Sequence, residues 1–314
     1  MQEIHLHHPY LPEQIPKKEE VVLVLGYFDG VHCAHQQVIR QGREIANCKG
    51  LKLALMTFDK QPLLVFKKFH ARLLTSLTPP DLKRDWMANL GVDYYYVVEF
   101  TSSFALLSPQ KFVDQYMVGL NAKVVVAGFD YTYGLKDVAN LLHLPKYAKG
   151  RFAIETVPEF KVQDRKVSST WIRELLSKGD IKQANQLLGF TYITEGIIVR
   201  GDGRGRTLGF PTANVEVSES VYLPGVGVYI NDIEVAGKKY RAMGSVGRNE
   251  TFGKGRRLTV ELNIFVFNQQ IYGEKVKIYW LQYLRAQKKF ASVKDLVQQL
   301  SKDKDLADRL NASL

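Results

Sequence analysis

The feature that most constrains the fold is a short, uninterrupted apolar run near the N-terminus. The run is Val21-Val22-Leu23-Val24-Leu25, which contains no polar residue and ends at Gly26. A strand that is buried on both faces has this pattern, because helices cover parallel sheets on each side. The segment 36–46 follows, with apolar residues at helical spacing. The sequence therefore predicts a strand and then a helix, the unit of parallel α/β sheets.

The same alternation continues through the first 190 or so residues of the chain. We predict strands at 51–58, 94–98 and 124–127, and helices at 81–90, 109–118, 168–176 and 181–188. Strands that alternate with helices along the chain favour one parallel sheet covered by helices. The first part of the chain is therefore expected to be an α/β domain.

The pattern changes after Gly189, where strands become short and glycine-containing turns become frequent. We predict strands at 196–200, 225–230, 239–244, 257–268 and 275–281, and an amphipathic helix at 292–310. Short strands at hairpin-like spacing are typical of an antiparallel barrel. The predicted class is thus α/β followed by β, with domains at 1–187 and 188–314, each long enough for its own core.

Composition limits the classes of function. The 314 residues are 46% hydrophobic, which is enough for real cores and excludes global disorder. No apolar run is long enough to span a membrane, the N-terminus has no signal-peptide pattern, and the two cysteines, Cys33 and Cys48, cannot form a disulfide scaffold. We therefore predict a cytoplasmic protein without a membrane partner.

The net charge of +11 has two explanations, nucleic-acid binding or small polyanionic ligands such as ATP. The basic residues are spread along the chain, and no zinc finger or long basic helix is visible. We therefore favour small polyanionic ligands over a nucleic-acid partner. The sequence leaves the oligomeric state open.

A glycine- and arginine-rich segment stands out in the second half of the chain. It is Gly203-Arg204-Gly205-Arg206-Thr207-Leu208-Gly209-Phe210-Pro211-Thr212-Ala213-Asn214. Glycines let the backbone approach a ligand closely, and guanidinium groups pair with phosphate oxygens. Thr212 and Asn214 offer two neutral oxygens that suit Mg²⁺ or a phosphate. The spacing fits neither the P-loop nor the dinucleotide fingerprint, so the residues alone leave a phosphate-binding loop and an ordinary surface turn equally open.

Two histidines follow the first predicted strand at the start of its helix. His32 and His35 are three residues apart, so both can face one phosphate from the same side of the helix. Ligands of open α/β sheets lie at the carboxyl ends of strands, and helix N-termini attract anions. Taken alone, the pair is better explained as two histidines in a turn, and a zinc site lacks an evident third ligand.

Two longer motifs change this balance. The segment Gly26-Tyr27-Phe28-Asp29-Gly30-Val31-His32-Cys33-Ala34-His35 resembles the nucleotidyltransferase signature Gly-x-Phe-Asp-Gly-x-His-x-Gly-His of bacterial bifunctional riboflavin kinase/FMN adenylyltransferases. The segment Gly209-Phe210-Pro211-Thr212-Ala213-Asn214 resembles the riboflavin kinase module of the same family. The motifs occur in the family's order, and the resemblance covers nearly the whole chain.

The resemblance implies a function in making flavin cofactors. It implies ATP-dependent phosphorylation of riboflavin to FMN and adenylylation of FMN to FAD with release of pyrophosphate, with Mg²⁺ as cofactor and ATP as co-substrate. It also implies a nucleotidyltransferase-type parallel domain followed by a kinase-type barrel. The alternative is a paralogue with one activity, most plausibly the adenylyltransferase, whose barrel would bind flavin or regulate. A flavin-responsive nucleic-acid binder is a third hypothesis, which only the charge suggests.

Site residues for the first domain follow from the resemblance. Two further segments, 126–134 and Ser168-Ser169-Thr170-Trp171-Ile172-Arg173, match family motifs at a strand end and a helix start. The implied catalytic residues are His32, His35 and Arg173; the implied ATP contacts are Gly26, Phe28, Asp29, Gly30, Gly128, Asp130, Ser168, Ser169 and Thr170; the implied flavin contacts are Phe58, Tyr131 and Tyr133.

For the second domain, the family places its catalytic glutamate at Glu261, which would act as a general base. A lone strand glutamate is more often a solvated side chain, and only the match favours catalysis. The implied ATP and phosphate contacts are Gly203, Arg204, Gly205, Arg206, Gly209, Pro211 and Asn214; the implied flavin contacts are Gly247, Thr251 and Arg285; the implied Mg²⁺ ligands are Thr212 and Asn214.

The chain also departs from the family pattern. Ala34 replaces the glycine between the histidines, and the segment 135–144 is largely apolar where the family has a glycine- and lysine-containing loop. In the second half, Ser245, Glu250 and Val266 replace a family asparagine, proline and aspartate. These substitutions leave open whether both activities survive.

Overall fold

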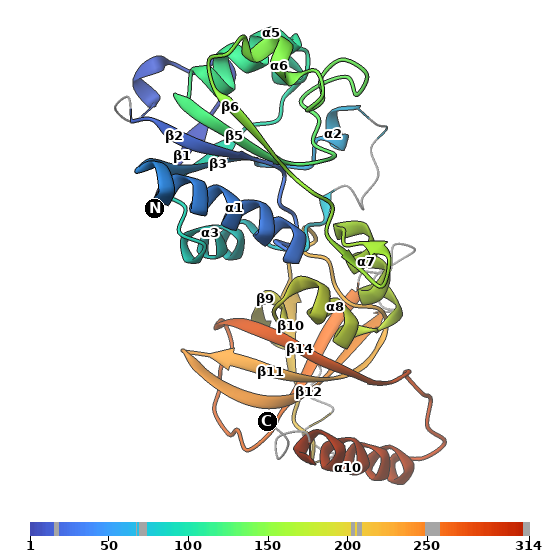
Figure 1. The fold of residues 1–314 in the computed structure, drawn as a ribbon. Coiled ribbons are helices and arrows are strands. Elements are labelled where there is room, and N and C mark those ends of the chain that lie inside the picture. Colours follow the sequence, from blue (N-terminus) through green and yellow to red (C-terminus); the bar gives the residue numbers. More distant parts are fainter. Residues whose placement is uncertain are drawn as a thin grey trace. The chain divides into compact units, whose positions relative to one another are not determined.

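The structure is a computed structural model. It describes residues 1–15, 19–66, 68, 74–201, 205, 209–248 and 258–309. The contacts between Cα atoms divide the chain into two compact units, Met1–Ser168 and Ser169–Leu314 (Figure 1).

The first unit is built on a six-stranded parallel sheet. The strands lie in the order β1 (Gln2–Leu6), β4 (Tyr94–Val98), β3 (Lys52–Phe58), β2 (Val21–Leu25), β5 (Ala122–Gly128) and β6 (Ala153–Val157). From β2 the chain adds β3 and β4 on one side, and later β5 and β6 on the other side. The direction of winding therefore reverses between β2 and β5, which makes this position the switch point of the sheet.

Helices cover both faces of this sheet (Figure 1). The helices α1 (Cys33–Lys49) and α3 (Pro80–Asn89) pack on one face, against Val22 and Val24 of β2. The other face buries Leu23 and Leu25 with α4 (Ser102–Ala105), α5 (Pro109–Val113), the π-helical turn η3 (Asp114–Val118) and α6 (Leu144–Ala148). Successive side chains of a strand point to opposite faces, so both sets must be apolar. The continuous apolar run is thus explained.

The parallel sheet and all four strands predicted for it are confirmed, and the remaining short elements of this unit were not predicted. They are the edge strands β1 and β6, the turn η1 (Pro12–Gln14), the helices α2 (Leu63–Phe66), α4 and α6, and the small hairpin of β7 (Lys161–Val162) and β8 (Arg165–Lys166).

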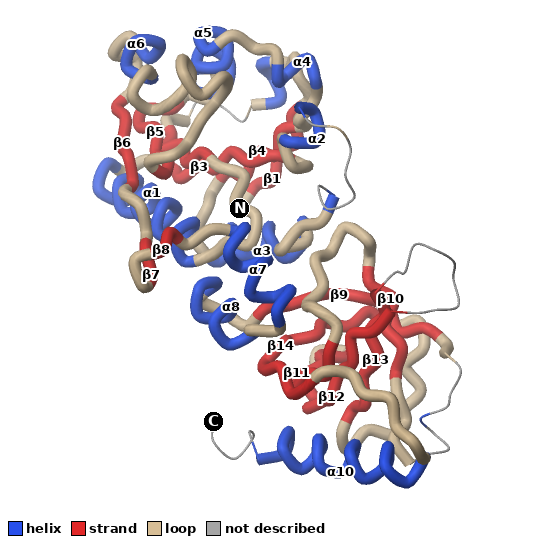
Figure 2. The backbone as a smooth tube through the Cα atoms, turned by 90° about the vertical axis from the view of Figure 1, so that its right-hand side faces the viewer, coloured by secondary structure: helices blue, strands red, loops and turns tan. Residues whose placement is uncertain are grey.

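The second unit begins with α7 (Ser169–Lys178) and α8 (Ile181–Leu188) and continues into a closed barrel. The barrel strands lie in the order β10 (Ala213–Val217), β13 (Leu258–Ile264), β12 (Lys238–Arg248), β11 (Gly227–Val235), β14 (Lys275–Arg285) and β9 (Tyr192–Val199), each antiparallel to its neighbours. Figure 2 shows these strands in red. The predicted antiparallel barrel is confirmed, although β10 was not predicted as a strand.

The barrel has an interior core and a second apolar contact on its outer surface. Inside, Trp280 packs edge-on against Tyr229 and donates a hydrogen bond from Nε1 to Thr194 Oγ1 at 3.0 Å. Outside, the terminal helix α10 (Val293–Arg309) buries Ala307 against a cluster that includes Phe265. The predicted terminal helix therefore forms one wall of the second unit.

The predicted domain boundary and the division into compact units place α7 and α8 differently. The sequence-based boundary at 187/188 puts both helices in the first domain, whereas their contacts put them in the second unit. The two helices contact each other, and α8 also contacts β9 and β14. The boundary at 187/188, as a division between functional domains, stays a prediction.

Candidate active sites

The first candidate site lies at the switch point of the parallel sheet. The loop 26–32 follows β2, and the segment 128–134 follows β5, its neighbour in the sheet. Both segments therefore leave the sheet at the same edge, where the direction of winding reverses. This is the position at which open α/β sheets bind ligands.

The loop after β2 has an unusual backbone. Phe28, Gly30 and Val31 have φ angles of 55°, 87° and 40°. Positive φ is uncommon for residues other than glycine and is a real outlier for a β-branched valine. The Phe28 ring lies over Gly26, where an added methyl group would come within 2.6 Å of it. The loop is thus held in a conformation that needs support from its surroundings.

Asp29 supplies part of that support. Its side chain is buried, and Oδ1 accepts hydrogen bonds from Ser76 Oγ at 2.9 Å and from the Leu77 backbone N–H at 2.8 Å. Predicted as an ATP contact, Asp29 is in this structure a tie between the loop and the segment before α3.

His32 and His35 lie together at the N-terminus of α1. His32 is the N-cap residue, and its Nδ1 accepts the backbone N–H of His35 at 3.4 Å. The two rings stack, with centroids 3.6 Å apart and planes 18° apart. The predicted convergence of the two histidines is therefore present in the geometry, at the N-terminus of a 17-residue helix.

Both histidines are neutral in the free protein. Burial is the main cause that lowers the pKa of His32 to about 4, and burial also lowers the pKa of His35 well below its usual value. Because His32 Nδ1 accepts a hydrogen bond, its ring proton is on Nε2. Within the described part of the chain, the buried Nδ1 of His35 has no hydrogen-bond partner. The pair therefore offers hydrogen bonds to a phosphate rather than positive charge.

Positive charge at this site comes from two lysines that sequence reasoning missed. Lys166 of β8 forms an ion pair with Asp130 and lies 4.8 Å from the centroid of the Phe129 ring. Lys166 and Lys83 both lower the pKa of His35. Lys166 stands two residues before Ser168, so its place beside the predicted motif was a usable signal. Lys83 lies far from every motif in the sequence.

The residues predicted to contact flavin pack against the core on the face of the sheet opposite α1. Phe58 packs edge-on against Phe100, with ring centroids 4.9 Å apart. Tyr133 stacks on Phe112, and within the described part of the chain its buried hydroxyl has no hydrogen-bond partner. Tyr131 packs partly buried against the same core. These contacts place all three tyrosine and phenylalanine side chains in one aromatic region.

The predicted serine and arginine motif is split between the two compact units. Ser168 is the last residue of the first unit, whereas α7 carries Ser169, Thr170 and Arg173 in the second. The Arg173 guanidinium lies 5.6 Å from the centroid of the Tyr222 ring. The predicted contacts of this motif with a nucleotide in the first unit stay predictions.

The second candidate site is on the outer surface of the barrel. Asn214 of β10 and Glu261 of β13 are direct partners in the antiparallel register, and Ser245 of β12 is the next residue in the same row. Their neighbours Val215 and Val260 are buried, so Asn214 and Glu261 share the outward face. Directly opposite residues have Cβ atoms about 4.5–5.5 Å apart. The barrel thus brings together two predicted residues that are 47 positions apart, as the numbers 214 and 261 show.

Glycines around this pair have backbones that leave no room for a side chain. A methyl group on Gly201 would lie 2.0 Å from Asn214 Nδ2, and one on Gly205 would lie 2.3 Å from the Phe210 carbonyl oxygen and 3.2 Å from Thr212 Oγ1. The predicted residues Gly203, Arg204, Arg206 and Thr251 lie outside the described residues.

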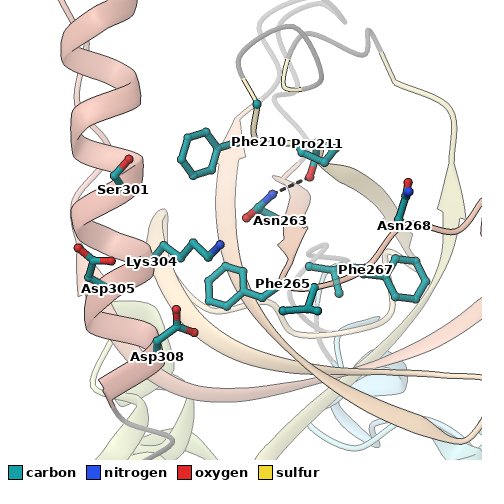
Figure 3. Close-up of a pocket in the computed structure, with 13 residues that line it drawn as sticks. Phe210, Pro211, Asn263, Phe265, Phe267, Asn268, Ser301, Lys304, Asp305 and Asp308 are labelled. Carbon is teal, nitrogen blue, oxygen red and sulfur yellow. Dashed lines mark hydrogen bonds between the residues drawn. The ribbon is translucent and has the colours of Figure 1, made fainter.

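A pocket of about 750 Å³ opens beside this loop (Figure 3). One wall carries Phe210 and Pro211, and the Pro211 carbonyl oxygen accepts a hydrogen bond from Asn263 Nδ2 at 2.7 Å. The other wall is α10, from which Lys304 reaches to within 5.4 Å of the Phe265 ring centroid. The volume lies in the range of pockets that hold drug-sized ligands.

The remaining predicted flavin contacts of the barrel are engaged within the protein. Arg285 donates from Nε at 2.9 Å and from Nη2 at 2.7 Å to Oδ2 of Asp303, which is buried on α10. A methyl group on Gly247 would lie 3.0 Å from Gln287 Nε2. Arg285 therefore anchors α10 in this structure, and its contact with flavin stays a prediction.

Family models match both halves of the chain. The model for FAD synthetase matches residues 14–171, and the model for riboflavin kinase matches residues 188–311. A curated protein of Listeria monocytogenes, named bifunctional riboflavin kinase/FMN adenylyltransferase, is 45% identical over 96% of this chain and 96% of its own length. The chain belongs to this bifunctional family.

Other relatives of this bifunctional family member extend over both halves. A Bacillus subtilis protein of the same name is 41% identical over 100% of this chain and 99% of its own. A crystal structure from Streptococcus pneumoniae, described as a macrolide-efflux protein, is 39% identical, covers 97% of this chain and 99% of that chain, and has a TM-score of 0.90. The description as an efflux protein applies to that structure only. Among the described residues of this family member, no helix is long and apolar enough to cross a membrane.

Proposed function

We propose that this chain phosphorylates riboflavin to FMN and adenylylates FMN to FAD, with ATP as the co-substrate of both steps. The observation that carries the proposal is the pair of family matches, one for each activity, over the same halves that hold the two candidate sites. The relatives that share both halves are named for both activities, which supports two activities over the single-activity alternative.

For FAD formation, a phosphate oxygen of FMN attacks the α-phosphorus of ATP, and the bond to the bridging oxygen breaks as pyrophosphate leaves. Such a transfer depends on positioning and on stabilising charge around the phosphorus. We assign phosphate binding to the N-terminus of α1 and to the neutral pair His32 and His35, which donate hydrogen bonds. Lys166 supplies positive charge next to them. The roles of Ser168 and Arg173 in this site are part of the proposal.

For FMN formation, the 5′-hydroxyl oxygen of riboflavin attacks the γ-phosphorus of ATP, and ADP leaves. We assign the acceptance of the hydroxyl proton to the Glu261 carboxylate, which is exposed beside Asn214. We place ATP in the pocket beside Pro211 and Lys304, because this pocket adjoins the loop that carries Thr212. The flavin then approaches Glu261 from outside the barrel.

The side chains around Asn214 fit a Mg²⁺ ion that is completed by substrate. Thr212 and Asn214 provide neutral oxygens, and glycine backbones lie close to both residues. The Glu261 carboxylate in the same row adds negative charge nearby and stays available to accept the hydroxyl proton. Among the described residues, no group of three histidine, cysteine or acidic side chains could hold a metal alone. Magnesium is commonly held by one or two carboxylates together with substrate phosphates. When bound, the ion neutralises charge on the phosphates of ATP.

The test is to offer riboflavin and FMN separately to the full-length protein with ATP and Mg²⁺ and to separate the products by chromatography. We expect FMN and then FAD from riboflavin, and FAD with pyrophosphate from FMN. FAD from FMN without any FMN from riboflavin would establish the single-activity alternative. If neither FMN nor FAD is formed, the proposal is overturned. Repeating the two assays without Mg²⁺ tests the metal requirement of each step.

A further inference from the structure

A buried lysine lies behind the loop that follows β2. Lys83, in the first turns of α3, is only 7% exposed, although lysine is almost never fully buried without a partner. Its Nζ donates a hydrogen bond to Thr57 Oγ1 at 3.1 Å and lies 4.8 Å from the centroid of the Tyr27 ring. A methionine or leucine would fill such a position at less cost, because burying an ammonium group removes its hydration.

The hydrogen bond of Lys83 continues into the loop. Thr57 donates its own hydroxyl proton to the Tyr27 carbonyl oxygen at 2.8 Å, so its oxygen remains free to accept from the ammonium. A charged donor strengthens such a chain, because each hydrogen bond polarises the next. Tyr27 immediately precedes Phe28, the first residue of the loop with positive φ. This series of hydrogen bonds therefore ends on the strained backbone of the loop.

The charges around Lys83 belong to the same site. Asp29, from the loop after β2, and Asp59, which follows β3, attract its ammonium group, while burial lowers the pKa of Lys83 to about 8. On the facing helix α1, Lys83 lowers the pKa of His35. At neutral pH the ammonium is therefore charged, and its charge acts on both Asp29 and His35.

We propose that Lys83 is a positioning residue for adenylyl transfer. Acting through Thr57, its ammonium group holds the Tyr27 carbonyl and so fixes the loop that presents the N-terminus of α1 and the histidine pair to the phosphates of ATP. The inference rests on the proposed adenylyltransferase function, and it assigns a role to a residue of α3, outside the loop after β2 and the segment 128–134 that form the candidate site. A lysine that only filled the core would not need a hydrogen-bonded path to the loop.

The first test measures both activities of the full-length protein with Lys83→Met and Lys83→Arg. Misplacing a reacting group by about 1 Å can cost on the order of 100-fold in rate. We expect Lys83→Met to lower kcat for FAD formation from FMN by up to about this factor and to leave riboflavin phosphorylation unchanged. Lys83→Arg keeps the charge and the donors, so it should recover most of the turnover. Equal loss of both activities in a folded Lys83→Met protein would overturn the proposal.

The second test removes the Thr57 hydroxyl, which links Lys83 to the loop, and keeps the Lys83 ammonium group. Thr57→Val has nearly the same shape but no hydroxyl, and we expect it also to lower kcat for FAD formation while changing the KM for FMN little. Should Lys83→Met fail to fold, this variant decides, and a wild-type kcat in Thr57→Val overturns the inference. A wild-type protein that makes no FAD from FMN overturns the adenylyltransferase function itself, and this inference with it.

A pH profile separates positioning by a charged group from simple packing. The value of kcat/KM reports groups of the free enzyme, so FAD formation by the wild type should fall as the pH rises through about 8, where Lys83 loses its proton. Lys83→Arg stays protonated, because arginine is always charged in proteins, and should not show this fall. The same alkaline fall in both proteins would contradict the role of the Lys83 charge.

Discussion

The two candidate sites obtain their geometry in opposite ways. The site of the first unit is made of loops that leave a parallel sheet. Its polar side chains are buried, and part of its backbone has positive φ angles. The site of the second unit is a row of residues across neighbouring antiparallel strands, and its glutamate is exposed. The comparison teaches that a loop site must be held by many partners, whereas a row of strand residues is placed by the backbone register alone.

This difference also changes the chemistry of the side chains. Burial takes the charge from His32 and His35, so their chemistry is set by the protein before any ligand binds. Glu261 stays in contact with solvent, so its surroundings become less polar only when substrates cover it. Substitutions in the two sites should therefore differ in whether they affect turnover alone or turnover together with folding.

The largest expected effect is in the barrel. If Glu261 is the general base, Glu261→Gln should lower riboflavin phosphorylation by about 10²–10⁴-fold and leave stability unchanged, because the side chain is exposed. Initial rates at saturating riboflavin and ATP measure it, with Glu274→Gln, an exposed glutamate outside the row, as the matched control. FAD formation from FMN should be unaffected. A variant that retains most of its riboflavin kinase turnover would make Glu261 an ordinary strand carboxylate.

The next effect is in the loop site. His35→Ala removes one hydrogen-bond donor from the predicted phosphate site, which typically costs about 10²–10³-fold in turnover. FAD formation from FMN should fall by this factor while FMN formation continues, and the exposed His7→Ala serves as the control. Because the side chain is also packed against Phe28 and His32, we expect lower thermal stability as well. Unchanged FAD formation would remove His35 from the site.

A smaller effect follows from the neutral state of His32. Its folded pKa of about 4 lies below the unfolded value near 6.5, so between these values the unfolded chain binds more protons. Stability should therefore be full above pH 6.5 and be lost as the pH falls towards 4, by about 2 kcal/mol at pH 5. Hydrogen exchange of α1 peptides at pH 7 and pH 5 measures this loss. His32→Asn keeps an N-cap residue and should show less of it.

The smallest effect is expected at Val266, beside the barrel pocket. This valine has a φ of 52° and a side chain that is 99% exposed, so its backbone is strained and no packing compensates. Left-handed backbone costs most residues about 1–2 kcal/mol, whereas asparagine tolerates it. Val266→Asn should raise the free energy of unfolding by about 1 kcal/mol, measured by urea denaturation. Val266→Ala, which keeps a Cβ atom, should gain less, and an equal gain would contradict the explanation.

The sequence was sufficient for the architecture because the central strands and the motifs carry local signals. The edge strands β1 and β6 were missed, since only part of each strand is buried and the continuous apolar pattern is absent. The strand β10 was not predicted, because its first two residues, Ala213 and Asn214, belong to the segment that the sequence analysis treats as a ligand loop. Each of these elements is defined by a partner strand that is distant in sequence.

The motifs found the residues that we propose bind the ligands, but not the residues that pack behind them. Asn214 and Glu261 were both predicted, and the barrel register then made them neighbours. Lys83 and Thr57 could not be found, because their meaning depends on a contact between α3 and the end of β3. The neutral state of the histidines was equally hidden, since it results from burial by many residues rather than from a motif.

Closure of the barrel limits how this protein can change in length. Each barrel strand is hydrogen-bonded on both sides, so β13 has no free edge along which it could slip. Deleting one residue upstream of Glu261 within β13 would turn the carboxylate inward and Leu262 outward, because side chains alternate along a strand. We therefore expect insertions and deletions to be tolerated in the turns between strands. Within the strands they should abolish phosphoryl transfer, even at positions where single substitutions are harmless.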